Sequence, residues 1–192
     1  MSAARSAPGV VRIIGGQWKR TRLVVADREG LRPTPERVRE TLFNWLGQDL
    51  TGWHCMDAFA GTGALGLEAA SRGAARCVLV EQDPALVRRL QDLCTRLAAH
   101  QVRVERGDGI AALQRVPVAS LDLVFLDPPF AGELFHRALA AAAMAIRPQG
   151  LIYLEAPRAW PPEALAALGL VAARTGKAGM VHFHLLGKMP AA

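Results

Sequence analysis

Short apolar runs and helical stretches alternate along most of the chain after Trp53. The apolar runs predict strands and cover residues 55–59, 77–80, 102–105, 121–126 and 151–155. The stretches between them have helical spacing and cover residues 64–72, 84–99, 109–114 and 133–146. Because these strands are mostly apolar, the five β-α repeats predict an α/β fold with a parallel sheet that helices cover on both faces.

The pattern changes near the C-terminal end. After Trp160 a short helix is predicted over residues 163–168. Two further apolar runs, 170–174 and 180–186, are joined by a Gly-Lys-Ala-Gly segment at 176–179. This arrangement predicts an antiparallel pair of strands that closes the otherwise parallel sheet.

The N-terminal part has a different organisation. Residues 12–25 contain two β-rich runs joined around Gly15 and Gly16, which is the pattern of a β-hairpin. We therefore divide the chain into a basic N-terminal arm with a small hairpin, residues 1–35, and a sheet domain, residues 36–192.

The first helix of the sheet domain has recognisable end signals. Apolar side chains repeat at helical spacing over residues 36–46, and Gly47 is well placed to end the helix. Thr34 is a suitable N-cap residue and Pro35 a suitable first helical residue.

Composition narrows the class of protein. The chain has 192 residues, of which 51% are hydrophobic, so it can bury a full core and is neither disordered nor collagen-like. The longest apolar run, 138–146, is far shorter than the roughly 20 residues that span a bilayer, and the N-terminus lacks a signal-peptide pattern. Cys55, Cys77 and Cys94 lack metal-ligand spacing, which predicts core packing. We expect a soluble, cytoplasmic monomer.

Charge is concentrated at the N-terminus. The net charge is +6, and residues 1–40 account for +5 of it, with nine basic and four acidic side chains. This asymmetry favours a polyanionic partner, although a solvated basic tail would have the same composition. Within the hairpin, Trp18 could stack on a base beside cations that contact phosphates. The candidate cations are Arg12, Lys19, Arg20 and Arg22.

The segment from Met56 to Glu68 is a strand, a glycine-rich turn and a helix, the context in which nucleotide-like ligands bind. Gly61 and Gly63 permit the torsions of a tight turn. Together with Gly66 they also match G-x-G-x-x-G, so a dinucleotide site is an alternative.

Three carboxylates bear on the choice of cofactor. Glu81 follows Asp57 by 24 residues and ends the next strand, where it could accept hydrogen bonds from an adenosine ribose in either NAD or S-adenosylmethionine. Asp57 is a poor neighbour for a pyrophosphate but a good one for a cationic amino-acid group, which favours S-adenosylmethionine. Asp108 could accept a hydrogen bond from the adenine amine, or it could be the N-cap of the following helix.

The fourth strand ends in the most specific motif of the chain, Asp127, Pro128, Pro129 and Phe130. The two prolines fix the backbone and leave the Pro128 carbonyl free. Asp127 and that carbonyl could accept hydrogen bonds from the exocyclic amine of a nucleobase, while Phe130 stacks on its ring. The pair of prolines could also simply end the strand. His182 and His184 lie on one face of a late strand without a third ligand, so no metal is expected.

These motifs resemble S-adenosylmethionine-dependent amino-methyltransferases, whose catalytic loop reads Asp/Asn-Pro-Pro-Phe/Tyr. More narrowly, the chain resembles the RsmD family, which methylates the N2 amine of one guanine in small-subunit (16S) ribosomal RNA. The shared motifs are Arg12-Ile-Ile-Gly-Gly, Leu31-Arg-Pro-Thr, Arg37-Val-Arg-Glu-Thr-Leu-Phe-Asn-Trp-Leu and Phe59-Ala-Gly-Thr-Gly-Ala-Leu-Gly-Leu-Glu-Ala.

The resemblance implies a Rossmann-like methyltransferase domain that binds S-adenosylmethionine and acts on ribosomal RNA, within a small-subunit particle or an assembly intermediate. The implied cofactor residues are Thr34, Asp57, Phe59, Gly61, Thr62, Gly63, Glu81, Asp108 and Gly109. The implied RNA-binding residues are Arg12, Trp18, Lys19, Arg20, Arg22, Arg32 and Arg37. A DNA adenine-N6 methyltransferase, a dehydrogenase and a non-catalytic RNA-binding assembly factor are the alternatives.

Overall fold

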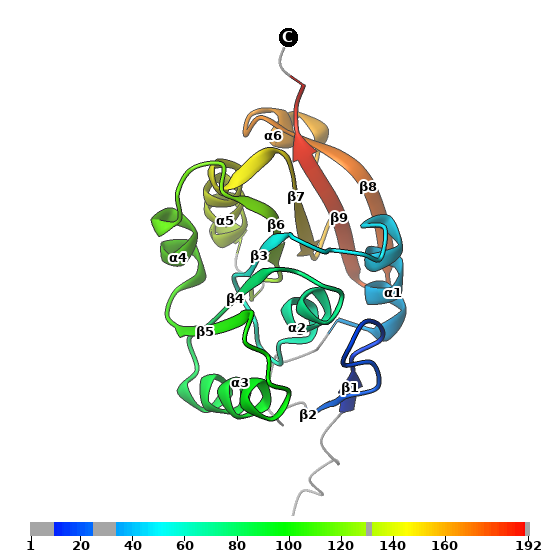
Figure 1. Cartoon of the computed structure of the whole chain (residues 1–192). Coiled ribbons are helices and arrows are strands. Elements are labelled where there is room, and N and C mark those ends of the chain that lie inside the picture. The colour runs from blue at the N-terminus through cyan, green and yellow to red at the C-terminus, as the bar shows by residue number, and fades with distance from the viewer. Residues whose placement is uncertain (1–9, 25–33, 130–131, 191–192) are drawn as a thin grey trace, which may run out of the picture.

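In the computed structural model, which describes residues 10–24, 34–129 and 132–190, strands β3 to β9 form one seven-stranded sheet (Figure 1). The strand order is β5-β4-β3-β6-β7-β9-β8. The strands are β3 (His54–Asp57), β4 (Arg76–Glu81), β5 (Val102–Arg106), β6 (Leu121–Leu126), β7 (Ile146–Ala156), β8 (Leu170–Ala178) and β9 (Val181–Lys188). Strands β3 to β7 pair in parallel, and β9 pairs antiparallel with both β7 and β8, which confirms the predicted closing pair.

Six helices pack around this sheet in the part of the chain that the structure describes. They are α1 (Glu36–Trp45), α2 (Ala64–Ser71), α3 (Pro84–Arg96), α4 (Gly109–Arg115), α5 (Gly132–Ala145) and α6 (Pro162–Ala166). Side chains of β3 alternate between two cores, with Cys55 in the core under α1, α2 and α3 and Met56 in the core under α4, α5 and α6. Apolar side chains on both faces explain why β4 and β6 consist mainly of consecutive apolar residues.

The largest differences from the predicted strand boundaries are at the start of β7 and the end of β8. Strand β7 begins at Ile146 because Ile146 pairs with Leu121 of β6, and the register between the two strands shifts before Leu151 pairs with Leu123. Strand β8 continues to Ala178, so Gly176 lies within a strand and not in the connection. A Cβ atom at Gly176 would lie 2.3 Å from the Phe183 ring, so glycine is needed there for close strand packing rather than for a turn.

The start of α1 corrects a second expectation. Pro35 occupies the N-cap position, with φ −55° and ψ 146°, and no side chain caps the helix. Thr34 is buried, and its hydroxyl donates a hydrogen bond to Glu155 Oε1 on β7 at 2.5 Å. Thr34 therefore joins the start of α1 to the central sheet instead of capping the helix.

The predicted hairpin is present as β1 (Val10–Arg12) and β2 (Arg22–Val24). Its connecting segment lies against the C-terminal end of α2: Gln17 N donates to the Ser71 carbonyl, and Trp18 N donates to the Ser71 hydroxyl. Gly16 has φ +72°, and a Cβ there would lie 1.8 Å from the Ser71 carbonyl oxygen. Only glycine fits this approach.

Glu68 on α2 holds the hairpin in place through partly buried hydrogen bonds. Its fully buried carboxylate accepts hydrogen bonds from the backbone amides of Ile14 and Gly15, both at 2.7 Å. Arg72 contacts Glu68 Oε1 at 2.9 Å and the buried Arg39 contacts Oε2 at 3.4 Å. Glu68 therefore links the hairpin to α1 and α2 through one buried polar cluster. Ile13 and Leu23 of the hairpin also pack into the core beneath α1 and α2.

The predicted packing role of the cysteines is confirmed: Cys55 and Cys77 are buried, Cys94 is partly buried, and all three are free thiols. None of the described helices combines the length and the hydropathy needed to cross a bilayer.

Candidate active site

Five carboxylates lie along the edge of the sheet formed by the carboxyl ends of its parallel strands. Asp57 pairs with Leu79 of β4 and Phe125 of β6, so Glu81 and Asp127 lie two residues beyond those positions on either side of it. Leu126 pairs with Leu154, which places Asp127 and Glu155 at the same level. In strand order the row is Asp108, Glu81, Asp57, Asp127 and Glu155.

The row crosses the point where the order of the strands reverses. From β3 the chain proceeds outward through β4 to β5 and then returns to β6 on the other side of β3. In open α/β sheets the connections at such a point diverge and leave a crevice in which ligands bind. Asp57 ends β3 and Asp127 follows β6, so the two motifs identified in the sequence lie on either side of this reversal of strand order.

Asp57 is completely buried and only partly satisfied. Its Oδ2 accepts a hydrogen bond from Gly66 N at 3.0 Å, whereas Oδ1 has no hydrogen-bond partner among the described residues. Burial raises the pKa of Asp57 to about 7, against the opposing effect of hydrogen bonds from Gly66 and Phe59 and with a smaller contribution from the charge of Glu81. A buried oxygen without a partner suits a ligand that brings a donor, and a cationic donor most of all.

The glycine turn after β3 requires two of its glycines. Gly61 and Gly63 have φ +52° and +78°, and a Cβ at Gly63 would lie 2.6 Å from Leu90. Gly61 N donates to Glu81 Oε2 at 2.8 Å, while Glu81 Oε1 accepts from Asp83 N at 2.8 Å. Glu81 is therefore fixed between the turn and the start of α3. Thr62 in the same turn is half-buried.

Asp108 is the N-cap of α4. Its Oδ1 accepts from Ala111 N at 2.8 Å and its Oδ2 from Gln82 Nε2 at 3.2 Å. Of the two interpretations left open by the sequence, the helix cap is the one seen in this structure. The adjacent Gly109 brings α4 close to β3, since a Cβ there would lie 1.9 Å from the Ala58 carbonyl oxygen. Phe59 is half-buried and packs against the core on the same side.

The loop after β6 combines burial with charge. Asp127 is half-buried, Pro128 is buried and Pro129 is exposed, whereas Phe130 lies outside the described residues. Burial raises the pKa of Asp127 well above its usual range, and the nearby charges of Glu155 and Asp57 raise it further. A carboxyl group with a strongly perturbed pKa in a crevice is a candidate for catalysis.

Glu155 is the member of this site that the sequence motifs did not indicate. Its Oε1 accepts from the Thr34 hydroxyl at 2.5 Å and from the Tyr153 hydroxyl at 2.9 Å. Burial raises its pKa, and those two hydrogen bonds lower it. The only signal in the sequence is an acidic residue at the end of an apolar strand. No group of three or more described His, Cys, Asp or Glu side chains could hold a metal ion.

The family model described as Conserved hypothetical protein 95 matches residues 11–187, nearly the whole chain. The chain belongs to this family. It is the RsmD family that the sequence motifs indicated. Two relatives are both described as "Ribosomal RNA small subunit methyltransferase D". The one from Escherichia coli is 45% identical over 134 residues, or 70% of this chain and 67% of its own length. The one from Haemophilus influenzae is 40% identical over 163 residues, or 81% and 83%.

A solved structure from Escherichia coli has the same fold as this RsmD family member. It is 35% identical with a TM-score of 0.80, and the match covers 94% of this chain and 98% of that chain. The predicted Rossmann-like methyltransferase fold is confirmed. The sequence motifs that resemble the RsmD family therefore predicted both the family and the fold.

The cationic side chains expected to bind RNA are exposed where the structure describes them: Arg12, Lys19, Arg20, Arg22 and Arg37. Trp18 is half-buried and packs against the core beneath the hairpin, so it presents only part of its ring to solvent. Arg32 lies outside the described residues.

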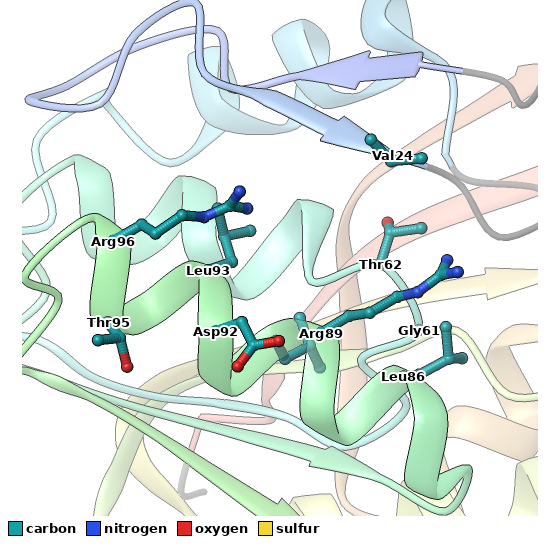
Figure 2. Close-up of a pocket in the computed structure, with 10 residues that line it drawn as sticks. Val24, Gly61, Thr62, Leu86, Arg89, Asp92, Leu93, Thr95 and Arg96 are labelled. Carbon is teal, nitrogen blue, oxygen red and sulfur yellow. The ribbon is translucent and has the colours of Figure 1, made fainter.

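A groove of about 710 Å³ separates the hairpin strand β2 from α3 and reaches the glycine turn (Figure 2). The sequence motifs did not indicate it, because its main wall is one face of a helix with an ordinary amphipathic pattern. Its lining residues are Val24, Gly61, Thr62, Leu86, Arg89, Leu90, Asp92, Leu93, Thr95 and Arg96.

Proposed function

We propose that this protein transfers a methyl group from S-adenosylmethionine to the exocyclic N2 amine of a guanine in small-subunit (16S) ribosomal RNA. Its RsmD family relatives carry the name of a small-subunit ribosomal RNA methyltransferase. The observation that carries the proposal is the position of Asp127, half-buried at the end of β6 and directly beside the strand that leads into the glycine turn.

The residues at the strand ends fit S-adenosylmethionine. Asp57 has a buried oxygen free to accept from the α-ammonium group, and Glu81 is fixed where a ribose would lie. Gly61, Thr62 and Gly63 would approach the cofactor with their backbone, while Phe59, Asp108 and Gly109 would border its adenine. Asp108 already accepts two hydrogen bonds, so its contact with an amine would replace or share one of them. When bound, S-adenosylmethionine supplies an electrophilic methyl group on a sulfonium.

On the substrate side, Asp127 and the Pro128 carbonyl would accept hydrogen bonds from the guanine amine, and Phe130 would stack on the ring. A guanine N2 lone pair is delocalised into the base. Hydrogen bonds to two fixed acceptors would favour a tetrahedral nitrogen and direct its lone pair toward the methyl carbon. The rigid proline backbone keeps those acceptors in place, and orientation of this kind can contribute on the order of 7–11 kcal/mol to the barrier reduction.

Thr34 and Glu155 would support the loop of Asp127 from within the core. Their short hydrogen bond ties the segment ahead of α1 to β7, beside Asp127. Both groups are buried, so they would set the position and charge of the site rather than contact the RNA. The exposed cations of the arm would bind RNA phosphates, in a particle or assembly intermediate in the cytoplasm, with the chain acting as a monomer.

The proposal is tested by nucleoside mass spectrometry of 16S ribosomal RNA from cells with and without the gene. We expect one N2-methylguanosine to be lost on deletion and restored by purified protein and S-adenosylmethionine acting on particles from the deletion strain. Restoration of N6-methyladenine in DNA would identify the adenine enzyme instead. Particle binding with no methyl transfer would identify an assembly factor, and reduction of a nicotinamide cofactor would identify a dehydrogenase.

The pKa of Asp57 leads to a specific dependence of cofactor binding on pH. With the pKa at about 7, the carboxyl group is mostly protonated below that pH and must lose its proton to pair with an ammonium group. Affinity for S-adenosylmethionine should therefore rise about tenfold per pH unit below pH 7 and level off above it. Isothermal titration calorimetry between about pH 5.5 and 7.5 measures this rise while most α-amino groups, whose ordinary pKa is about 7.7–8.0, are still protonated.

The matched variant is Asp57→Asn, which keeps the acceptor for Gly66 and removes the titrating group. It should bind S-adenosylmethionine more weakly at about pH 7.5 and show no rise with pH. A rise that persists in this variant would assign the titration to another carboxyl group of the site and exclude Asp57 as the cation partner.

A further inference from the structure

We propose that the groove between β2 and α3 binds the phosphodiester backbone of single-stranded RNA and leads it toward the glycine turn. The inference rests on the proposed function and extends the RNA-binding surface from the hairpin to a helix of the sheet domain. The sequence motifs placed RNA contacts only in the N-terminal segment and in Arg37 of α1, whereas this groove has its main wall on α3.

Helix α3 gives the groove an apolar base and an exposed, charged side. Leu86, Leu90 and Leu93 are buried, so the base of the groove on α3 is apolar. Arg89 and Arg96 are exposed on the same helix, seven residues apart and therefore on one face. In Figure 2 the Arg89 side chain extends along the groove toward Gly61 and Thr62, while Arg96 lies nearer the other end of α3.

These arginines have no structural role that the described contacts reveal. Neither forms an ion pair or a side-chain hydrogen bond with another described residue. Arg96 lies in the last turn of α3, where a cation also favours the helix dipole, but Arg89 lies mid-helix and gains nothing from it. Asp92 is exposed between them and leaves this wall with a net charge of +1 from its three charged groups.

The opposite wall adds positive charge. Val24 lines the groove from β2, and Arg22 lies on the same face of that strand because side chains alternate. Arg12 pairs with Arg22 across the hairpin and shares this face. A polyanion lying in the groove would therefore meet arginines from α3 and from the hairpin together.

The lining favours a nucleic-acid backbone over bases. None of the described residues that line the groove is aromatic, so nothing there offers the stacking surface on which single-stranded bases usually lie. The arginines and the Thr62 hydroxyl instead suit phosphate and sugar oxygens, whereas the Thr95 hydroxyl already donates a hydrogen bond to the Gln91 carbonyl at 3.0 Å. Gly61 and Thr62 belong to the turn proposed to hold the cofactor, so the groove leads directly to the proposed site.

The test measures binding of a fluorescein-labelled oligouridylate by anisotropy over a series of KCl concentrations. The double variant Arg89→Gln and Arg96→Gln should bind more weakly than wild type and lose about 1.4 from the slope of log affinity against log salt, because each phosphate contact to a single strand contributes about 0.7. The double variant Arg89→Lys and Arg96→Lys keeps both charges and should retain the wild-type slope.

The matched control is Arg174→Gln with Lys177→Gln. Both residues are exposed on β8, the strand at the opposite edge of the sheet from β5. This control should keep the wild-type slope, and all variants should melt at the wild-type temperature. An equal loss in the control would show that the effect is one of net charge and would overturn the groove proposal.

Two outcomes separate this inference from the proposed function. If wild type binds RNA with a steep salt dependence but the α3 glutamine variant has the same slope, the groove is not a phosphate site. If that variant also loses methylation of particles, the groove contacts a ribosomal protein, which again overturns the RNA assignment. If wild type neither binds RNA nor methylates particles, the proposed function itself fails.

Discussion

Replacing Asp127 with asparagine should reduce kcat for methyl transfer by about 10²- to 10³-fold, comparable to the loss of one hydrogen-bonding group that acts on developing charge. Asparagine keeps the size of the side chain but offers one acceptor oxygen and an amide donor that would face the guanine amine. The pKa of Asp127 is raised by burial and by Glu155 and Asp57, so this variant also removes a group held in an unfavourable environment.

The measurement is transfer of tritiated methyl groups to ribosomal particles, together with the affinity for S-adenosylmethionine. We expect kcat to fall while the affinity stays close to that of wild type, because Asp127 is assigned to the substrate. We also expect the variant to be at least as stable as wild type, since a neutral amide carries no cost for a buried charge.

Asp122→Asn is the control on the same strand. Asp122 lies at the other end of β6, where it accepts from His54 N at 2.7 Å and pairs with Arg147 at 2.6 Å. Its replacement should lower the melting temperature and leave kcat unchanged. Equal activity in the Asp127 and Asp122 variants would remove Asp127 from the chemistry.

Replacing Glu68 with alanine should destabilise the protein by about 3–5 kcal/mol, the cost of removing one member of a buried ion pair. The change leaves the buried Arg39 without its carboxylate and the amides of Ile14 and Gly15 without an acceptor. Urea unfolding measures the loss. Because Glu68 anchors the hairpin, RNA affinity should fall as well, under conditions in which the protein is still folded.

Two further variants make this result interpretable. Glu163→Ala removes an exposed acid from α6 and should change stability by no more than about 0.5 kcal/mol. Glu68→Gln keeps one acceptor oxygen and should lie between wild type and Glu68→Ala. If Glu68→Ala unfolds at the same urea concentration as Glu163→Ala, the Glu68 carboxylate does not anchor the hairpin.

Local sequence patterns were sufficient for most of the fold. Apolar runs predicted β6 at its observed bounds, and the helix predicted over residues 84–99 begins at the observed first residue of α3, where Asp83 caps the helix. Such features depend only on residues that are close together in the sequence. The predicted strand boundaries were wrong where a contact with a distant residue fixes the end of the strand. Gly176, for example, lies within β8, where the Phe183 ring of β9 packs over it.

The candidate site divides in the same way. The sequence by itself determined the family, the glycine turn, Glu81 and the loop of Asp127, because each is written in consecutive residues whose chemistry is readable. Only the tertiary structure decided that Thr34 bonds to Glu155, that Glu68 holds the hairpin, and that Arg89 and Arg96 face β2 across a groove. Thr34 and Glu155 are separated by 121 positions in the sequence, and Glu68 and Ile14 by 54. The groove likewise lies between α3 and the hairpin, which are distant in the sequence. No local pattern encodes such pairs, since they form only when burial brings separate segments together.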